Sequence, residues 1–196
     1  MKKKHLEMLL ERLEGHPRPA PEREQYDTPA SVAADMLFLA YLRGDLGVVC
    51  DLGCGAGILS VGAAMLGARA VGVEIDTEAL AAARRNAERL GACVDFIRAD
   101  VNFLSLKGID TVIMNPPFGA QKASPGDRAF LKKATQMART VYTLHNAGSE
   151  AFIRRFIEPC HVQEIYRIPF PLKRSFKFHR EDMRIIEVEL YRITCL

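Results

Sequence analysis

The clearest absence in the sequence is a long hydrophobic run. No stretch of the 196 residues approaches the roughly 20 apolar residues that a membrane-spanning helix needs. The basic start, Met1–His5, is not followed by an apolar segment, so a secretory signal is not indicated. No internal repeat or low-complexity segment is visible. We therefore expect a globular, cytoplasmic protein without a membrane partner.

Cysteine is also scarce, and no two cysteines form a CxxC motif. An odd number of cysteines argues against a disulfide framework. Cys50 and Cys54 are too isolated from other ligand types to suggest zinc, so we expect no metal site. Small buried thiols in a reducing cytosol are the favoured interpretation. The five residues are Cys50, Cys54, Cys93, Cys160 and Cys195.

Length and charge set further bounds. The chain suits a single domain large enough for a three-layer core. We expect an N-terminal helix and an extended lead-in over residues 1–23, followed by one domain over residues 24–196. The net charge of +3 makes the chain mildly basic, which permits a nucleic-acid partner without requiring one.

Four predicted strands in the first part of the chain end in polar side chains. The strands cover residues 48–52, 70–74, 94–100 and 110–115, with helices or loops between them. Such alternation predicts a mostly parallel sheet, and ligands bind at the carboxyl ends of such strands. The polar residues at those ends are Asp51, Glu74, Asp100 and Asn115.

The remainder is expected to begin with a helix over residues 127–145. Its buried stripe would consist of Phe130, Ala134, Met137 and Val141. A short helix near residue 150 and three strands, about 161–168, 175–178 and 184–194, complete the pattern. The last two strands are close enough in sequence to pair as a hairpin.

A glycine-rich turn follows the first strand. Its pattern is Asp-x-Gly-x-Gly-x-Gly from Asp51 to Gly57, which differs from the dinucleotide fingerprint. Glu74 lies about twenty residues beyond the glycines, the spacing at which an acid meets a ribose on the neighbouring strand. A plain charge at a helix entry is the alternative for Glu74.

The fourth strand ends in Asn115-Pro116-Pro117-Phe118. Two prolines stop further sheet pairing and hold the backbone extended. An amide beside proline carbonyls provides acceptors for an –NH2 group, and a phenyl ring can stack on a flat base. A turn with a capping asparagine is the alternative interpretation.

Basic and aromatic residues alternate over residues 167–180, a composition that suits phosphate contacts and base stacking. A solvated strand edge is the alternative. Lys122 lies in a polar loop that follows Phe118. The candidate RNA-binding residues are Lys122, Lys173, Arg174, Lys177, Phe178, His179 and Arg180.

These motifs together resemble those of class I S-adenosylmethionine-dependent methyltransferases. More closely, the chain resembles the methyltransferase-like-five family, which forms N6-methyladenosine in small-subunit ribosomal RNA. The resemblance runs from about residue 24 to the C-terminus. It is carried by residues 24–28, 51–55, 64–67, 110–119, 137–140, 144–145, 176–179 and 187–190.

The resemblance implies a Rossmann-like, three-layer αβα fold with a seven-stranded, mostly parallel sheet and an antiparallel C-terminal hairpin. It also implies a catalytic motif at Asn115, Pro116, Pro117 and Phe118. The implied S-adenosylmethionine contacts are Gln25, Tyr26, Thr28, Asp51, Gly53, Gly55, Ala56, Gly57, Ile58, Glu74, Asp100, Val101 and Asn115.

Two other activities use the same chemistry, namely protein glutamine N5-methylation and DNA adenine N6-methylation. Phe118 and the basic C-terminal segment favour nucleic acid over a protein amide, and the short chain favours RNA over DNA. Related enzymes pair with a small zinc-binding activator subunit. The strand predicted at residues 94–99 is the expected edge for such a partner.

Overall fold

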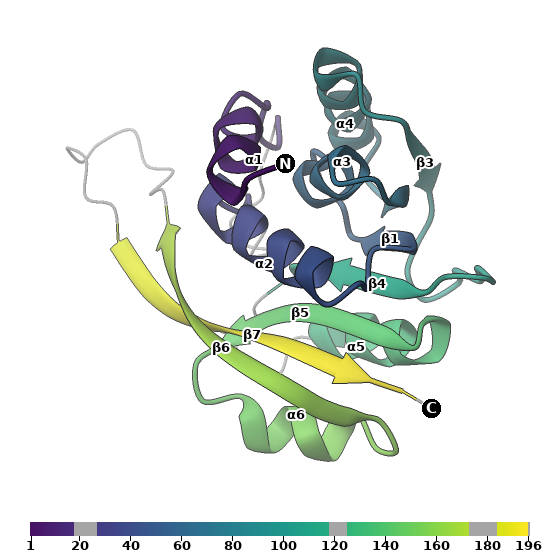
Figure 1. Cartoon of the computed structure of the whole chain (residues 1–196). Coiled ribbons are helices and arrows are strands. Elements are labelled where there is room, and N and C mark those ends of the chain that lie inside the picture. Colours follow the sequence, from purple (N-terminus) through teal and green to yellow (C-terminus); the bar gives the residue numbers. More distant parts are fainter. Residues whose placement is uncertain (18–26, 118–124, 173–183, 196) are drawn as a thin grey trace, which may run out of the picture.

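A seven-stranded sheet forms the middle layer of the computed structural model, with the strand order β3-β2-β1-β4-β5-β7-β6 (Figure 1). The structure describes residues 1–17, 27–117, 125–172 and 184–195. The strands are β1 (Val48–Leu52), β2 (Arg69–Glu74), β3 (Val94–Arg98), β4 (Thr111–Met114), β5 (Thr140–Asn146), β6 (His161–Leu172) and β7 (Arg184–Thr194).

Strands β1 to β5 are parallel, and β7 inserts antiparallel between β5 and β6. The central strand β4 is buried along its whole length. Its apolar sequence reflects this position, because helices cover both faces of a parallel sheet. The predicted mostly parallel sheet with an antiparallel C-terminal hairpin is confirmed.

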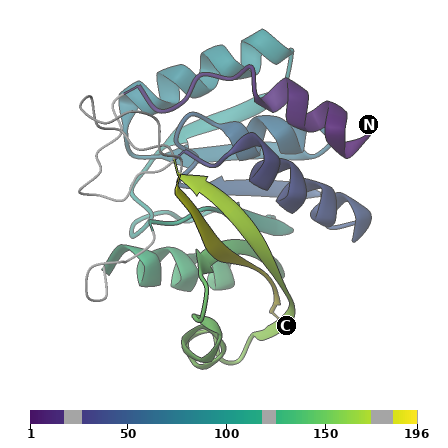
Figure 2. The ribbon, with the colours of Figure 1, turned by 90° about the vertical axis from the view of Figure 1, so that its left-hand side faces the viewer.

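Helices form the two outer layers. Figure 2 shows α2 and α4 over one face of the sheet, and Figure 1 shows α5 and α6 beneath the other. Two apolar cores result, one under α1–α3 and one under α5 and α6. The helices are α1 (Lys3–Leu10), α2 (Ala30–Leu42), α3 (Ile58–Met65), α4 (Thr77–Leu90), α5 (Pro125–Met137) and α6 (Glu150–Phe156). Within the described residues, no helix has the length and apolar character of a membrane span.

The helix predicted over residues 127–145 is wrong in its second half. Helix α5 ends at Met137, and Thr140–Asn146 forms the buried strand β5. This segment reads Thr-Val-Tyr-Thr, and β-branched and aromatic side chains favour strands. The helical spacing that includes Val141 concealed this preference. The strand predicted at 175–178 lies outside the described residues, and the hairpin is formed by β6 and β7.

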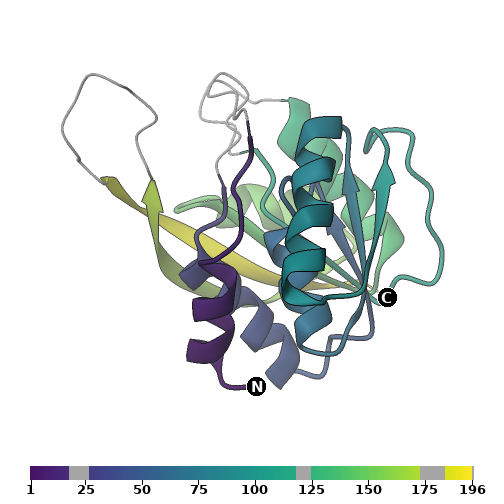
Figure 3. The same cartoon turned by 90° about the horizontal axis from the view of Figure 1, so that it is seen from above.

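The β6–β7 ribbon extends beyond the parallel strands. Asn146, the last residue of β5, pairs with Val188, so β7 begins four residues before that pairing. At about 3.3 Å per residue, the ribbon overhangs the carboxyl edge of the sheet by roughly 13 Å. Phe170 and Val188 anchor it in the core beneath α2. Figure 3 shows both chain termini on the side away from this overhang.

A polar network closes the opposite, amino edge of the sheet. The Asp45 carboxylate accepts hydrogen bonds from the Tyr142 hydroxyl at 2.6 Å and the Arg192 Nε at 2.9 Å. Asp45 follows α2, whereas Tyr142 and Arg192 lie opposite each other on β5 and β7. Because both charged side chains are mostly buried, the network ties the helical layer to the sheet.

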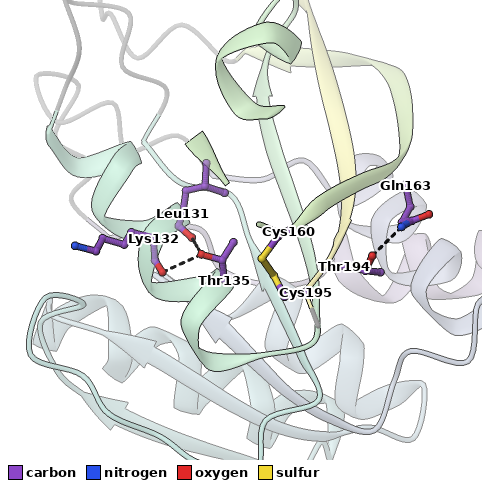
Figure 4. Close-up of a disulfide and its surroundings, with 7 residues drawn as sticks. All are labelled: Leu131, Lys132, Thr135, Cys160, Gln163, Thr194 and Cys195. Atoms are coloured by element: carbon purple, nitrogen blue, oxygen red, sulfur yellow. Dashed lines mark hydrogen bonds between the residues drawn. A yellow bond between two sulfur atoms is a disulfide. The ribbon is translucent and has the colours of Figure 1, made fainter. Parts of the chain in front are cut away.

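A disulfide joins Cys160 to Cys195 (Figure 4), so the expectation of free thiols is wrong for this pair. Cys160 precedes β6 and Cys195 follows β7. Pairing of His161 with Thr194 brings the two cysteines to a Cα–Cα distance of 4.4 Å. The count and spacing of cysteines carry no information about this contact, because strand pairing creates it.

We expect Cys195→Ser to lower the free energy of unfolding by roughly 2–4 kcal/mol, because the crosslink restricts the unfolded chain. Urea denaturation with and without dithiothreitol measures this difference. The matched control is Cys93→Ser, since Cys93 is an exposed free thiol and its replacement should leave stability unchanged. Equal stability of the wild-type chain in oxidising and reducing buffer would contradict the expectation.

Candidate functional site

A cavity of about 310 Å³ opens at the carboxyl edge of the sheet. The ends of three neighbouring parallel strands form its floor, and the start of α5 forms one wall. This is the position at which open α/β sheets bind ligands. The lining residues are Leu52, Gly53, Val73, Glu74, Ile75, Ala99, Asp100, Val101, Asn102, Ala129 and Phe130.

The turn between β1 and α3 depends on glycine. Gly53, Gly55 and Gly57 have φ angles of 76°, 52° and 83°, which other residues rarely adopt. A side chain at Gly53 would also lie 2.7 Å from the Phe130 ring. The turn therefore brings bare backbone to the cavity and lets the Phe130 ring of α5 pack directly against Gly53.

Glu74 connects the end of β2 to this turn. Its Oε2 accepts the Gly55 N–H at 3.0 Å, and its Oε1 accepts the N–H groups of Ile75 and Asp76 at 2.8 and 3.0 Å. The carboxylate is therefore held rigidly at the cavity while it retains acceptor capacity. A carboxylate fixed in this way can accept the hydroxyl groups of a ribose.

Asp100 provides a second acid at the cavity. Its Oδ1 accepts hydrogen bonds from the backbone and side-chain nitrogens of Asn102 at 2.8 and 2.9 Å. These contacts form a turn that sets Val101 into the lining. The Oδ2 atom makes no hydrogen bond with the described residues, so it can accept an N–H of a ligand.

Asn115 is held by Thr28 from the start of α2. The Asn115 Nδ2 donates to the Thr28 Oγ1 at 3.0 Å. The Asn115 Oδ1 is shielded from solvent and has no hydrogen-bond partner among the described residues. An unpaired buried acceptor costs free energy, and a substrate that donates a hydrogen bond would remove this cost. The site thus presents an amide oxygen to an –NH2 group.

Asp51 lies beneath the turn and does not line the cavity. Its Oδ2 accepts the Ser60 N–H at 2.8 Å, which fixes α3 to β1. Burial raises the pKa of Asp51 to about 7, opposed by the hydrogen bonds from Ser60 and assisted by the charge of Glu74. The described contacts of Asp51 are therefore with the protein itself.

The cavity fits the nucleoside part of S-adenosylmethionine. Its volume lies at the lower end of the range for ligand pockets. Two carboxylates flank apolar walls, which suits ribose hydroxyls, an adenine amine and a flat ring. Within the described parts of the chain, no group of three or more His, Cys, Asp or Glu side chains is arranged to hold a metal ion.

The structure brings together only part of the predicted site. Gly53, Glu74, Asp100 and Val101 line the cavity, whereas Gly55, Ala56, Gly57 and Ile58 belong to the adjoining turn and helix. Pro116 is buried and Pro117 is half-buried beside Asn115. The following predicted residues lie outside the described residues: Gln25, Tyr26, Phe118, Lys122, Lys173, Arg174, Lys177, Phe178, His179 and Arg180.

Seven of the eleven lining residues escaped the sequence analysis, two of them despite available signals. Phe130 matched the buried stripe of a helix, but its ring faces the cavity beside Gly53. Ile75 is an apolar residue between two acids, and it is 52% exposed. Because Ile75 directly follows Glu74, the predicted ribose acid, its apolar side chain could have been predicted to line the cavity.

Comparisons with known proteins agree with this geometry. The Methyltransferase small domain family model matches residues 32–148. The chain is 37% identical to the rRNA N(6)-adenosine-methyltransferase METTL5 of Danio rerio, and the match covers 99% of each chain. It is 41% identical to a Methanocaldococcus jannaschii protein, and this match covers 98% of the present chain and 94% of the relative. A crystal structure of a Pyrococcus horikoshii protein assigned as an RNA methyltransferase superposes with a TM-score of 0.89 at 36% identity, covering 100% and 98%.

The raised pKa of Asp51 predicts a pH-dependent stability in the absence of ligand. The folded chain holds this proton up to about pH 7, whereas an unfolded Asp loses it near the ordinary value of 3.8. The free energy of unfolding should therefore fall as the pH rises from about 4 to 7, by on the order of 2–4 kcal/mol.

Asp51→Asn should remove this contribution, because the amide oxygen still accepts the Ser60 N–H and cannot ionise. Urea denaturation of both proteins at pH 5 and pH 8 measures the difference. Identical pH profiles for the two proteins would show that Asp51 does not carry the effect.

Proposed function

Because the chain belongs to the Methyltransferase small domain family, and within it to the METTL5-type rRNA N6-adenosine methyltransferases, we propose that it methylates adenosine N6 in ribosomal RNA with S-adenosylmethionine as the methyl donor. The single observation that carries this proposal is the Asn115 amide at the end of β4, with its oxygen unpaired and its nitrogen held by Thr28.

The amide explains how a weak nucleophile can be activated. The N6 lone pair of adenine is delocalised into the ring, so the amine reacts poorly. When the Asn115 Oδ1 and the Pro116 carbonyl oxygen accept its two hydrogens, electron density stays on the nitrogen, which can become pyramidal. S-adenosylmethionine, when bound, supplies a methyl group on a positively charged sulfur. Positioning and fixed dipoles then provide most of the acceleration.

Thr28 contributes by fixing the direction of the amide. With Nδ2 donating to the Thr28 hydroxyl, Oδ1 is the atom left for the substrate. A rotated amide would present an N–H to the amine, and two donors would repel each other. No strong base is required, because the methylated nitrogen is acidic and water can take its proton.

The cavity residues support the cofactor half of the proposal. We assign the ribose hydroxyls to Glu74 and the adenine amine to Asp100, with the N–H of Val101 for a ring nitrogen. Phe130 and Ile75 provide apolar walls for the ring. Gln25, Tyr26 and the turn from Gly53 to Ile58 remain proposed contacts for the rest of the cofactor.

The overhanging β6–β7 ribbon supports the RNA half. Its described end, Leu172 and Arg184, projects past the carboxyl edge of the sheet, on which Asn115 also lies. The basic and aromatic residues at 173–180 follow directly in sequence. We propose that they hold the RNA backbone with Lys122, while Phe118 stacks on the target base. The base must leave its stack, which costs roughly a few kcal/mol unless it is already unpaired.

We further propose that the target adenosine lies in the small-subunit RNA. The resemblance to the methyltransferase-like-five family supports this choice.

Asn115→Ala should lower methyl transfer at least about 100-fold, because the acceptor for the amine is lost. Binding of S-adenosylhomocysteine, measured by calorimetry, should change much less. Tritium transfer to separated small and large ribosomal subunits provides the assay. The control is Asn146→Ala, which removes an amide from the end of the neighbouring strand β5.

Full activity of the Asn115→Ala variant would contradict the assignment of Asn115 as the acceptor for the amine. Label in large-subunit RNA would contradict the small-subunit proposal alone. Label in protein would favour glutamine N5-methylation instead.

We also propose a small zinc-binding activator subunit that adds a strand to β3. In the described sheet, β3 is the outermost strand and pairs only with β2. Phe103, just beyond β3, is 88% exposed, and Ile75 at the end of β2 is 52% exposed. Strand addition would cover the open edge, and apolar contacts would supply affinity.

Tagged chain purified from its own cells should carry about one equivalent of zinc in a stable complex. Phe103→Glu should remove most of this zinc, because a charge replaces the apolar contact. Tyr41→Glu is the matched control, since Tyr41 is an exposed aromatic residue on α2, away from β3. Zinc-free, fully active wild-type chain would contradict the proposal.

A further inference from the structure

Residues 12–16, here called the N-terminal strap, run across α4 after α1 ends. The Arg89 Nη1 donates to the Arg12 carbonyl oxygen at 2.9 Å. Arg85 and Arg89 also pair with the Glu14 carboxylate at 2.8 and 2.9 Å. These ion pairs are partly exposed, so they contribute little to stability on their own. A buried contact is needed to explain why the strap lies here.

Asn86 of α4 supplies this contact. Its side chain is fully buried. The Oδ1 accepts the Glu14 N–H at 2.9 Å, and the Nδ2 donates to the Glu14 carbonyl oxygen at 2.9 Å. One amide thus pairs with both backbone groups of a single strap residue, as a neighbouring strand would.

The second hydrogen of the Asn86 amide joins the strap to the cofactor turn. Nδ2 also donates to the Ala56 carbonyl oxygen at 2.9 Å. Ala56 lies between Gly55, which is bonded to Glu74, and Gly57, where an added side chain would lie 3.0 Å from Ala83 of α4. The turn is therefore fixed from β2 on one side and through Asn86 on the other.

The other end of the strap leads to the catalytic amide. The His16 N–H donates to the Asp27 Oδ1 at 2.9 Å. An added side chain at Gly15 would lie 2.3 Å from the Asp27 Oδ2, so the Asp27 carboxylate packs against the bare Gly15 backbone. Thr28, which holds Asn115, follows Asp27 directly. The strap is therefore linked to both parts of the site. Asn86 connects Glu14 to the cofactor turn, and His16 connects the strap to the segment that carries Thr28.

We propose that Asn86 is a positioning residue for the active site, and that it uses the backbone of the strap to hold the cofactor turn and the Thr28–Asn115 pair in register. The inference rests on the proposed function. Asn86 touches neither substrate nor cofactor in this assignment. It acts through the carbonyl of Ala56 and the backbone of Glu14, and its side chain is buried.

Asn86→Asp is the decisive variant. Its side chain can still accept the Glu14 N–H, but an ionised carboxylate donates to neither Glu14 nor Ala56 and repels both carbonyl oxygens, and a protonated one can donate to only one of them. We expect the Kd for S-adenosylhomocysteine, measured by calorimetry, to rise about tenfold. We also expect kcat for RNA methylation at saturating donor to fall about tenfold, in a protein that still melts cooperatively above the assay temperature.

Glu14→Ala is the matched control. It removes the exposed ion pairs with Arg85 and Arg89 but keeps the backbone groups that Asn86 holds. Its Kd and kcat should stay within twofold of wild type. Wild-type values in Asn86→Asp, or an equal loss in Glu14→Ala, would overturn the proposal. Failure of the wild-type chain to bind S-adenosylhomocysteine would instead refute the proposed function.

Hydrogen exchange on the wild-type chain tests the same link if Asn86→Asp does not fold. S-adenosylhomocysteine should slow exchange of the Glu14 amide together with the amides of residues 53–57. The amides of β7, which lies between β5 and β6 and does not line the cavity, serve as the reference. Protection of residues 53–57 with no change at Glu14 would overturn the inference.

Discussion

The backbone turn between β1 and α3 is the constraint on which the site depends. Three glycines with positive φ fold it tightly enough for Glu74 to reach across to the Gly55 N–H and for Phe130 to approach Gly53. The cavity and two of the side chains that line it, Glu74 and Phe130, take their positions from this turn. Asn86 supports the turn from behind, so the cofactor side is held by side chains from three separate elements.

The sequence predicted the features that follow from local pattern. Glu74, Asp100 and Asn115 could be located because each closes or follows an apolar run, and the two prolines after Asn115 mark the end of its strand. Strand β5 was missed because a helical stripe and a β-branched run overlap in Thr140–Asn146. Local spacing could not decide between helix and strand. This segment forms a strand because it pairs with β4 on one side and β7 on the other, and only the assembled sheet provides both partners.

Contacts between distant segments could not be predicted in this way. The Cys160–Cys195 disulfide, the Asn86–Glu14 pairing and the place of Phe130 beside Gly53 all join residues that only the folded sheet brings together. The same holds for the contact of Asp51 with the protein. Its motif marked the residue, but gave no sign that its carboxylate accepts the Ser60 N–H of α3.

The stabilising contacts and the candidate site lie at opposite edges of the sheet. The amino edge carries the Asp45–Tyr142–Arg192 network and the disulfide, and the carboxyl edge carries the cavity and Asn115. The β6–β7 ribbon spans both, with the disulfide at one end and its overhang at the other. A two-residue slip between its strands would move the overhang by about 6–7 Å. Because the disulfide fixes the pairing at the base of the ribbon, the register of two strands sets how far the described end of the ribbon projects beyond the carboxyl edge that carries Asn115.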